Sequence, residues 1–145
     1  MEMIMTAQPA FTAPAKGRAL PVAPWGTQGL LAPFFVYAGV SKLFTPVEQL
    51  ATMIPWTGEY GALVTIAGTA DLAGGLGILL PLLTRIQPRL TVLAALGLIV
   101  LQVLAAVFHL SRGEFAVVSV NAVLIGLSAF VHWGRAKARP IAPRA

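Results

Sequence analysis

Four long apolar stretches constrain this chain more than any other feature of its sequence. They run over residues 27–44, 60–83, 90–110 and 115–133, and short segments with prolines, glycines and charged residues separate them. Each stretch has about the 20 residues that a helix needs to cross a hydrocarbon layer about 30 Å thick. Backbone polar groups inside lipid must be satisfied within their own segment, so each stretch should be a helix. Because the connections are short, we expect an all-α membrane protein, an antiparallel bundle of four transmembrane helices.

The composition agrees with burial in lipid rather than in a soluble core. The chain is 57% hydrophobic and 10% charged, whereas soluble domains are about 45–50% apolar and about 25% charged. The four stretches are also apolar all round and lack the charged face of a surface helix. These features argue against a soluble enzyme and against a disordered protein. The chain has no cysteine, which excludes disulfides, thiolate metal sites and thiol redox chemistry by the chain itself.

The basic residues predict how the spans are oriented. Only Lys42 and Arg112 lie on one side of a four-span topology, and the other eight basic residues lie on the opposite side: Lys16, Arg18, Arg85, Arg89, Arg135, Lys137, Arg139 and Arg144. Since Lys and Arg accumulate in cytoplasmic loops, both termini are expected in the cytoplasm. The isoelectric point near 10.5 then reflects orientation and attraction to anionic lipid head groups. It does not indicate nucleic-acid binding.

Three parts follow from this topology. Residues 1–26 are rich in Ala, Pro and Thr and lack the apolar run of a secretory signal, so we expect a flexible cytoplasmic N-terminal tail. Residues 27–135 form the transmembrane domain, and residues 136–145 form a basic cytoplasmic C-terminal tail. Amphipathic rings prefer the two membrane interfaces, which places Trp25 and Trp133 at the inner one and Trp56 and Tyr60 at the outer one.

Asp71 is the strongest candidate for a functional residue, because an ionisable side chain inside a membrane is costly. It lies about 16 Å below the outer end of the second stretch, at 1.5 Å per residue. Its neighbours at spacings of three and four are small: Ala67, Gly68, Gly74 and Gly75. Small residues let helices approach closely, so Asp71 should face the interior of the bundle. Asp71 either takes part in the function of the protein or only forms a hydrogen bond between packed helices.

Lys42, at the outer end of the first stretch, has two interpretations. Its side chain either extends to water from the helix end or serves as the cation that keeps Asp71 ionised. The expected depths of the two residues do not match well. A direct pair would therefore require a bridging water or a later start of the second helix. Tyr37, one turn earlier, is a further candidate that packing alone could explain.

The third and fourth stretches add four polar candidates. Gln102 and His109 are seven residues apart and share a helix face; Gln102 lies near the depth of Asp71, where it suits an interhelical hydrogen bond. His109 lies near the outer surface and could titrate near neutral pH, or it could be an interface residue. Glu114 is close enough in sequence to cap His109, and Asn121 could join the network around Asp71. Nothing has the spacing of a metalloprotease site, and the different depths of Asp71, His109 and Glu114 argue against a metal site formed by these three. No catalytic residue can be assigned.

Several short blocks together resemble the DoxX-like family of small bacterial four-helix membrane proteins. They are YAGVSKLF at 37–44, GTADLAGGLGILLP at 68–81, FHLSRGE at 108–114, Asn121 and WGR at 133–135. The resemblance covers about residues 27–135 and implies a bacterial inner-membrane protein. Family members often have Glu where this chain has Asp71, which keeps the carboxylate but shortens its reach. Some relatives are associated with quinone-linked oxidation of thiosulfate or with membrane redox complexes that handle thiol stress.

The first functional hypothesis is a membrane subunit or accessory of a quinone-linked redox complex. A quinone or similar lipophile would bind in the outer half of the bundle, where Lys42, Asp71 and His109 supply hydrogen bonds and protons. Electrons would come from a redox protein partner, since the chain has no recognisable flavin or haem site. The alternatives are a small proton-coupled transporter or permeability factor, which would need to form a homo-oligomer, and a non-catalytic membrane anchor or assembly partner.

Overall fold

The described part of the chain is entirely helical. A computed structural model describes residues 19–138. Its elements are α1 (Ala19–Phe44), α2 (Val47–Met53), the 3-10 turn η1 (Pro55–Gly58), α3 (Gly61–Thr84), α4 (Arg89–Ser111), α5 (Phe115–Trp133) and the π-helical turn η2 (Gly134–Ala138). No strand occurs between residues 19 and 138. The expected all-α class is confirmed.

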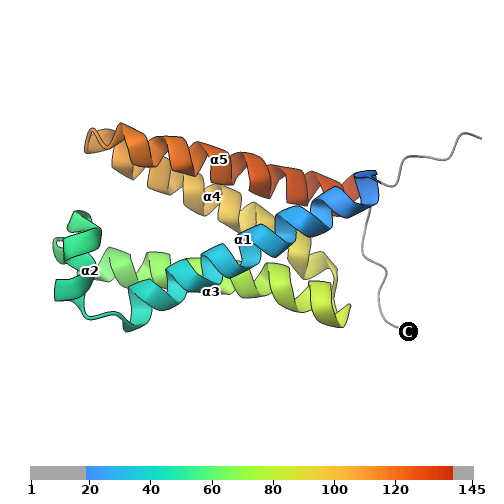
Figure 1. Cartoon of the computed structure of the whole chain (residues 1–145), viewed down its shortest axis with the longest axis horizontal. Helices are drawn as coiled ribbons and strands as arrows, with labels where there is room; N and C mark the ends of the chain where they lie inside the picture. The colour runs from blue at the N-terminus through green and yellow to red at the C-terminus, as the bar shows by residue number, and fades with distance from the viewer. Residues whose placement is uncertain (1–18, 139–145) are drawn as a thin grey trace, which may run out of the picture.

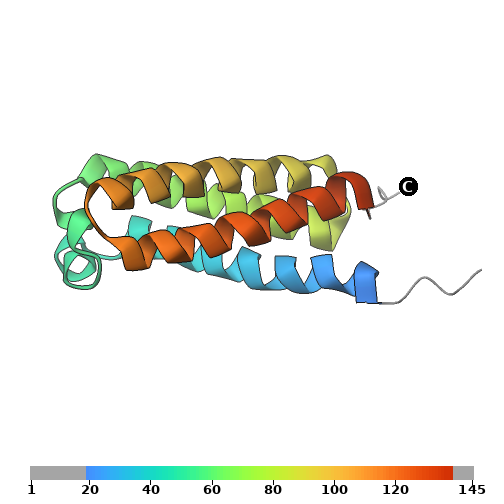
Figure 2. The same ribbon diagram turned by 90° about the horizontal axis from the view of Figure 1, so that it is seen from above.

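The four long helices lie side by side, and the chain reverses direction at each connection (Figures 1 and 2). α1 packs mainly along α3, α4 packs mainly along α5, and α3 also contacts α4. Contacts between α1 and α5 are sparse. Figure 1 shows why: the two pairs converge where the described chain begins and ends, and they diverge toward α2 at the opposite end.

Three helices are long and apolar enough to cross a membrane: residues Gly61–Pro81, Arg89–Ser111 and Phe115–Ala138. Large apolar side chains are exposed on their outer surfaces, for example Ile66, Leu93 and Val123. A protein in water would not leave so many such side chains exposed, but lipid tails are suitable neighbours for them. The chain is therefore a membrane protein. α1 does not reach the same apolarity.

Two expected boundaries need correction. α1 begins at Ala19, so residues 19–26 continue a helix and do not belong to a tail. The Pro24 ring contacts Gly134, since its Cγ lies 3.2 Å from the place where a Gly134 β-carbon would stand. This packing against the far end of the chain stabilises a helix start that composition alone does not predict. Residues 136–138 likewise belong to η2, while residues 1–18 and 139–145 of the expected tails lie outside the described residues.

The apolar core lies in the half where the two helix pairs converge. It joins all four long helices through Leu31, Ala32, Phe35, Ile78, Ala95, Leu98, Leu124 and Val131. A second, smaller cluster near α2 contains Leu50, Trp56 and Val64, with Phe108 packed against it. Buried polar residues lie between the two clusters, and others, among them Gln28, Ser128 and Arg135, lie within or beyond the larger one.

Glycines set the register of α1 on α3. A β-carbon on Gly39 would lie 2.6 Å from the Leu72 backbone nitrogen, and one on Gly75 would lie 2.8 Å from the Val36 backbone nitrogen. Two helices can approach backbone to backbone in this way only where side chains are absent. The same close contact brings Lys42 against Gly68, one turn of α3 before Asp71.

Candidate functional site

Lys42 and Asp71 form a direct ion pair between α1 and α3. Lys42 Nζ donates to Asp71 Oδ2 at 2.7 Å, and the two side chains are only 17% and 6% exposed. The expectation that a direct pair needs a bridging water or a later helix start is wrong. α3 starts at Gly61, close to the expected residue, but it extends past the end of α1 because Lys42 packs against Gly68. The two charges therefore meet at one level.

The facing wall of the site consists of α4 and α5. Gly74 packs against Leu98, and Gly77 packs against Ala94; continuing this antiparallel register by one turn brings Asp71 to the level of Gln102. Gln102 is 6% exposed and Asn121 is 5% exposed.

Both of these buried amides have unmet hydrogen-bonding atoms. Gln102 Oε1 and Asn121 Nδ2 have no hydrogen-bond partner within the described part of the chain. A buried polar atom without a partner costs about 1–3 kcal/mol, so native proteins pair nearly all of them with protein, water or ligand. The interhelical hydrogen bond expected for Gln102 is therefore not made by its oxygen.

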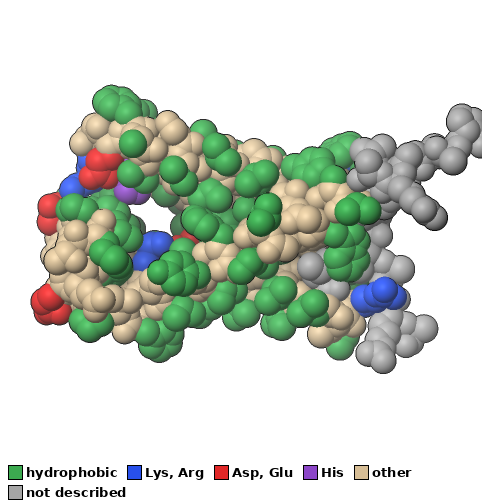
Figure 3. Space-filling model, viewed as in Figure 1, with side chains coloured by type: hydrophobic (Ala, Val, Ile, Leu, Met, Phe, Trp, Pro, Cys, Tyr) green, Lys and Arg blue, Asp and Glu red, His purple; other side chains and the backbone are tan. Residues whose placement is uncertain are grey.

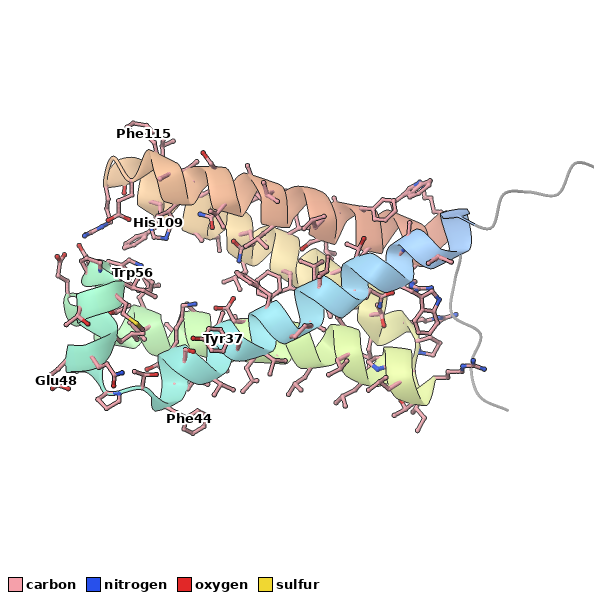
Figure 4. All side chains as sticks on the ribbon, viewed as in Figure 1. Tyr37, Phe44, Glu48, Trp56, His109 and Phe115 are labelled. Carbon is pink, nitrogen blue, oxygen red and sulfur yellow. The ribbon has the colours of Figure 1, made fainter. Side chains whose placement is uncertain are left out.

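A hollow separates these two walls. Figure 3 shows it between the helix pairs, with basic and acidic side chains on the α1–α3 side and a histidine at its rim. Figure 4 identifies the rim residues as His109 and Trp56. Tyr37 is 72% exposed on the outside of α1, so the structure does not bring this candidate into the hollow.

A chain of polar contacts leads outward from His109. His109 Nδ1 lies 2.5 Å from Glu114 Oε2, and because an ionised carboxylate can only accept, the imidazole donates. Arg112 donates from Nε to Glu114 Oε1 at 3.0 Å and from Nη1 to Glu59 Oε2 at 3.1 Å. The expected contact of Glu114 with His109 is thus present. It leaves His109 Nε2 as the nitrogen available to the hollow.

These contacts close the end of the molecule where α2 lies, and we call the assembly of Trp56, Glu59, Tyr60, Phe108, Arg112 and Glu114 the roof. The Arg112 guanidinium lies 5.7 Å from the centroid of the Tyr60 ring and 5.6 Å from that of Phe108. Trp56 stacks edge to face on Phe108, with ring centroids 5.4 Å apart. The roof joins η1 and the start of α3 to the turn between α4 and α5.

Electrostatics reinforce the roof. Hydrogen bonds from His109 and then from Arg112 hold the pKa of Glu114 below its ordinary value of 4.5. The bonds to Glu114 and Glu59 raise the pKa of Arg112 above its already high ordinary value. Both shifts favour the charged forms, so Arg112 and Glu114 form an ion pair at neutral pH.

Trp56 is buried beside Leu50 and Val64, so its ring packs within the protein where the sequence predicted a side chain at the membrane interface. Arg112 is the centre of the roof, a position that the sequence did not predict. The length of the segment between the first two stretches, with its apolar Leu50 and Ile54, was the available signal that this segment folds back on the bundle.

Arg135 was also assigned differently, as a charge that orients the chain. It is buried at the opposite end of the molecule, where its Nε donates to Gln28 Oε1 at 2.5 Å and its guanidinium lies 5.0 Å from the centroid of Trp25. Within residues 19–138, no group of three or more His, Asp or Glu side chains could hold a metal ion.

The helices expose apolar side chains to their surroundings, and they enclose an ion pair and two amides. These features define a small helical membrane protein with a polar internal site. The chain belongs to the DoxX-like family, whose model matches residues 26–131. The match includes all of α3 and α4 and most of α1 and α5, and it confirms the resemblance seen in the sequence. No curated protein and no solved structure matches the chain.

Proposed function

We propose that the protein crosses a bacterial inner membrane four times, with both termini in the cytoplasm. α1 has 26 residues, about 39 Å at 1.5 Å per residue, and it packs on α3 over several turns. A helix attached in this way spans with its neighbour even though its own sequence is less apolar. The excess of Lys and Arg in the terminal segments and in the turn after α3 supports the orientation.

We propose further that the hollow binds a lipophilic molecule with a polar head group, of which a quinone is the best example. The observation that carries this proposal is the pair of unmet buried amide atoms, Gln102 Oε1 and Asn121 Nδ2, at the level of the Lys42–Asp71 ion pair. A head-group hydroxyl in this position, as in the quinol form, would donate to Gln102 Oε1, and a head-group oxygen would accept from Asn121 Nδ2. The surrounding apolar side chains would favour a ligand that partitions into lipid.

The chemistry of these residues suits a quinone, because its reduction takes up protons and its oxidation releases them. In the proposed complex, Lys42 and Asn121 donate hydrogen bonds to head-group oxygens, and Asp71 holds Lys42 in place. His109 Nε2 exchanges a proton with the ligand, and Glu114 stabilises the imidazolium that results. Electrons come from a redox protein partner in the same membrane.

Transport is less well supported than binding. The apolar core closes the bundle below the hollow with side chains from all four long helices, among them Phe35, Ile78, Leu98 and Leu124. A path through one copy of the chain would have to open this packing. A homo-oligomer with a path between copies remains the form in which a transporter would work.

The test uses the full chain in lipid nanodiscs and decylubiquinone as the probe. Binding should be measurable by equilibrium dialysis, and Asn121→Leu and Asp71→Asn should each weaken it at least tenfold. Glu48→Gln is the matched control, since Glu48 is an exposed carboxylate on α2 that points away from the hollow (Figure 4). Absence of binding, or equal binding by all the variants, would refute the quinone site.

The same variants distinguish the hypothesis of a membrane anchor from that of a ligand-binding protein. If Asp71→Asn weakens co-purification with a partner protein but leaves decylubiquinone bound, then the carboxylate serves assembly rather than ligand binding. Mass spectrometry of the natively purified protein identifies co-purifying lipophiles and partner proteins directly.

A further inference from the structure

α1 and α5 meet along a seam that can be followed in steps of seven residues on each helix. At the first level Pro24 packs against Gly134. Seven residues later on α1 and seven residues earlier on α5, Leu31 and Leu127 take part in the same apolar core. The next step brings Ala38 opposite Val120, because residues seven apart return to the same helix face.

At this third level the seam is open. Val120 is 51% exposed, whereas Leu31 at the level below is 1% exposed. Figure 1 shows α1 and α5 diverging at this level, and Figure 3 shows the hollow open toward this side of the molecule, with the background visible through it. The opening lies between two lipid-facing helices, and the nearby segment of α5 carries the exposed apolar side chains Val117 and Val120.

The outer end, in contrast, is closed by the roof. Arg112 bridges Glu59 on one side and Glu114 on the other, and Trp56 is 6% exposed beneath them. A water-soluble molecule approaching along the bundle axis would have to break these ion pairs. A lipid-soluble molecule approaching from the side meets no such barrier.

We propose that the ligand of the hollow enters sideways from the outer half of the bilayer, between α1 and α5, and that it keeps a hydrocarbon tail in this opening while its head group binds. The ligand class is then narrower than a lipophile: it is a head-and-tail amphiphile whose polar head fits between Lys42 and Asn121. This inference rests on the proposed function, since it concerns access to the same site.

The test exploits the absence of cysteine from the chain. Two double variants are prepared in the full chain: Ala38→Cys with Val120→Cys across the seam, and Glu59→Cys with Arg112→Cys across the roof. Each double variant is linked with a bis-maleimide that carries a cleavable disulfide spacer. The same protein is measured before linking, after linking and after cleavage of the spacer. The readout is the rate of decylubiquinone uptake into nanodisc-held protein.

Linking the seam should slow uptake at least tenfold, and cleavage of the spacer should restore it. Linking the roof should change the uptake rate less than twofold. Undiminished uptake through a linked seam, or uptake blocked by a linked roof, would overturn side entry while leaving the site itself intact. If neither variant takes up the probe before linking and the unmodified protein also fails to bind it, the proposed function fails and side entry fails with it.

Discussion

At the scale of single residues, the site depends on charges that have been removed from water. The Lys42–Asp71 pair is largely buried, and burying two ions costs several kcal/mol per ion that their mutual attraction must offset. A pair of this kind contributes little net stability compared with apolar residues of similar size. Its retention in the middle of a membrane protein therefore favours a role in binding or proton exchange.

Breaking this pair from one side should destabilise the protein more than removing it completely. Lys42→Met leaves the Asp71 carboxyl without its cation and should lower the free energy of unfolding by about 3–5 kcal/mol. Lys42→Met combined with Asp71→Leu should recover most of that loss. Unfolding by SDS titration in mixed micelles measures all three proteins, and a double variant less stable than Lys42→Met would contradict the argument.

The roof should weaken in acid. Because the pKa of Glu114 is lowered in the folded protein, its bonds stabilise the fold fully above its ordinary value of 4.5. The stabilisation is lost as pH falls from that value through the lowered pKa. The thermal midpoint of the wild type should therefore fall when the pH is lowered from about 6 to about 3. The midpoint of Glu114→Gln should fall less, because its amide does not titrate. If the thermal midpoints of the two proteins fall equally with pH, Glu114 contributes nothing to the loss of stability in acid.

At the scale of elements, the contact between α1 and α3 decides where the site forms. Three glycines, Gly39, Gly68 and Gly75, hold the two backbones together, and this register brings Lys42 within reach of Asp71. α4 and α5 are joined by the short turn of Arg112, Gly113 and Glu114 and are linked again at the opposite end, where His132 Nδ1 lies 3.1 Å from the Val92 carbonyl oxygen. Each wall of the hollow is thus a helix pair with its own fixed register.

A methyl group at Gly39 should separate α1 from α3. In Gly39→Ala the new β-carbon would meet backbone atoms of Leu72 and Gly68 at 2.6 and 2.7 Å, so the helices must shift, which typically costs about 1–3 kcal/mol. Decylubiquinone affinity should fall as well, because the walls of the site move. Gly126→Ala is the control, since nothing lies within 4 Å of its β-carbon position. Equal stability of the two variants would contradict the close packing.

At the scale of the whole molecule, the two helix pairs are joined firmly at one end and only through the roof at the other. The core clusters mark the two contacts, and the hollow lies between them. This arrangement places a polar site, with its ion pair largely buried, inside an apolar exterior. The two ends of the site also differ, because the roof lies only at the end where α2 and η1 are found (Figures 1 and 2).

The proposed orientation predicts which turns can be labelled from outside the cell. Ser111→Cys, next to the roof, should react with a membrane-impermeant maleimide in intact cells. Thr84→Cys, at the end of α3, should react only after the cells are permeabilised, since positive-inside topology places that turn in the cytoplasm. Mass-tagged gels quantify both reactions, and the opposite pattern would reverse the topology.

Much of the fold could be predicted from the sequence, but the geometry of the site could be predicted only in part. The starts of α3, α4 and α5 fall within a residue of the expected apolar stretches, because segment length and hydropathy are local properties. The contact of Glu114 with His109 was also predictable, since the residues are five apart along the chain. The direct Lys42–Asp71 bond and the burial of Trp56 were not, because both depend on how far α3 extends beyond α1.

The sequence by itself determined that this chain is a helical membrane protein and which polar residues it carries into the apolar interior, since each of these follows from composition within one segment. Only the tertiary structure decided that Lys42 reaches Asp71. It alone also showed that Gln102 Oε1 and Asn121 Nδ2 are buried without a hydrogen-bond partner in the described part of the chain. The physical reason is that lipid-exposed helices are alike in sequence. Their relative register and tilt are set by where glycines allow backbones to touch and by where a few ion pairs bind the ends together.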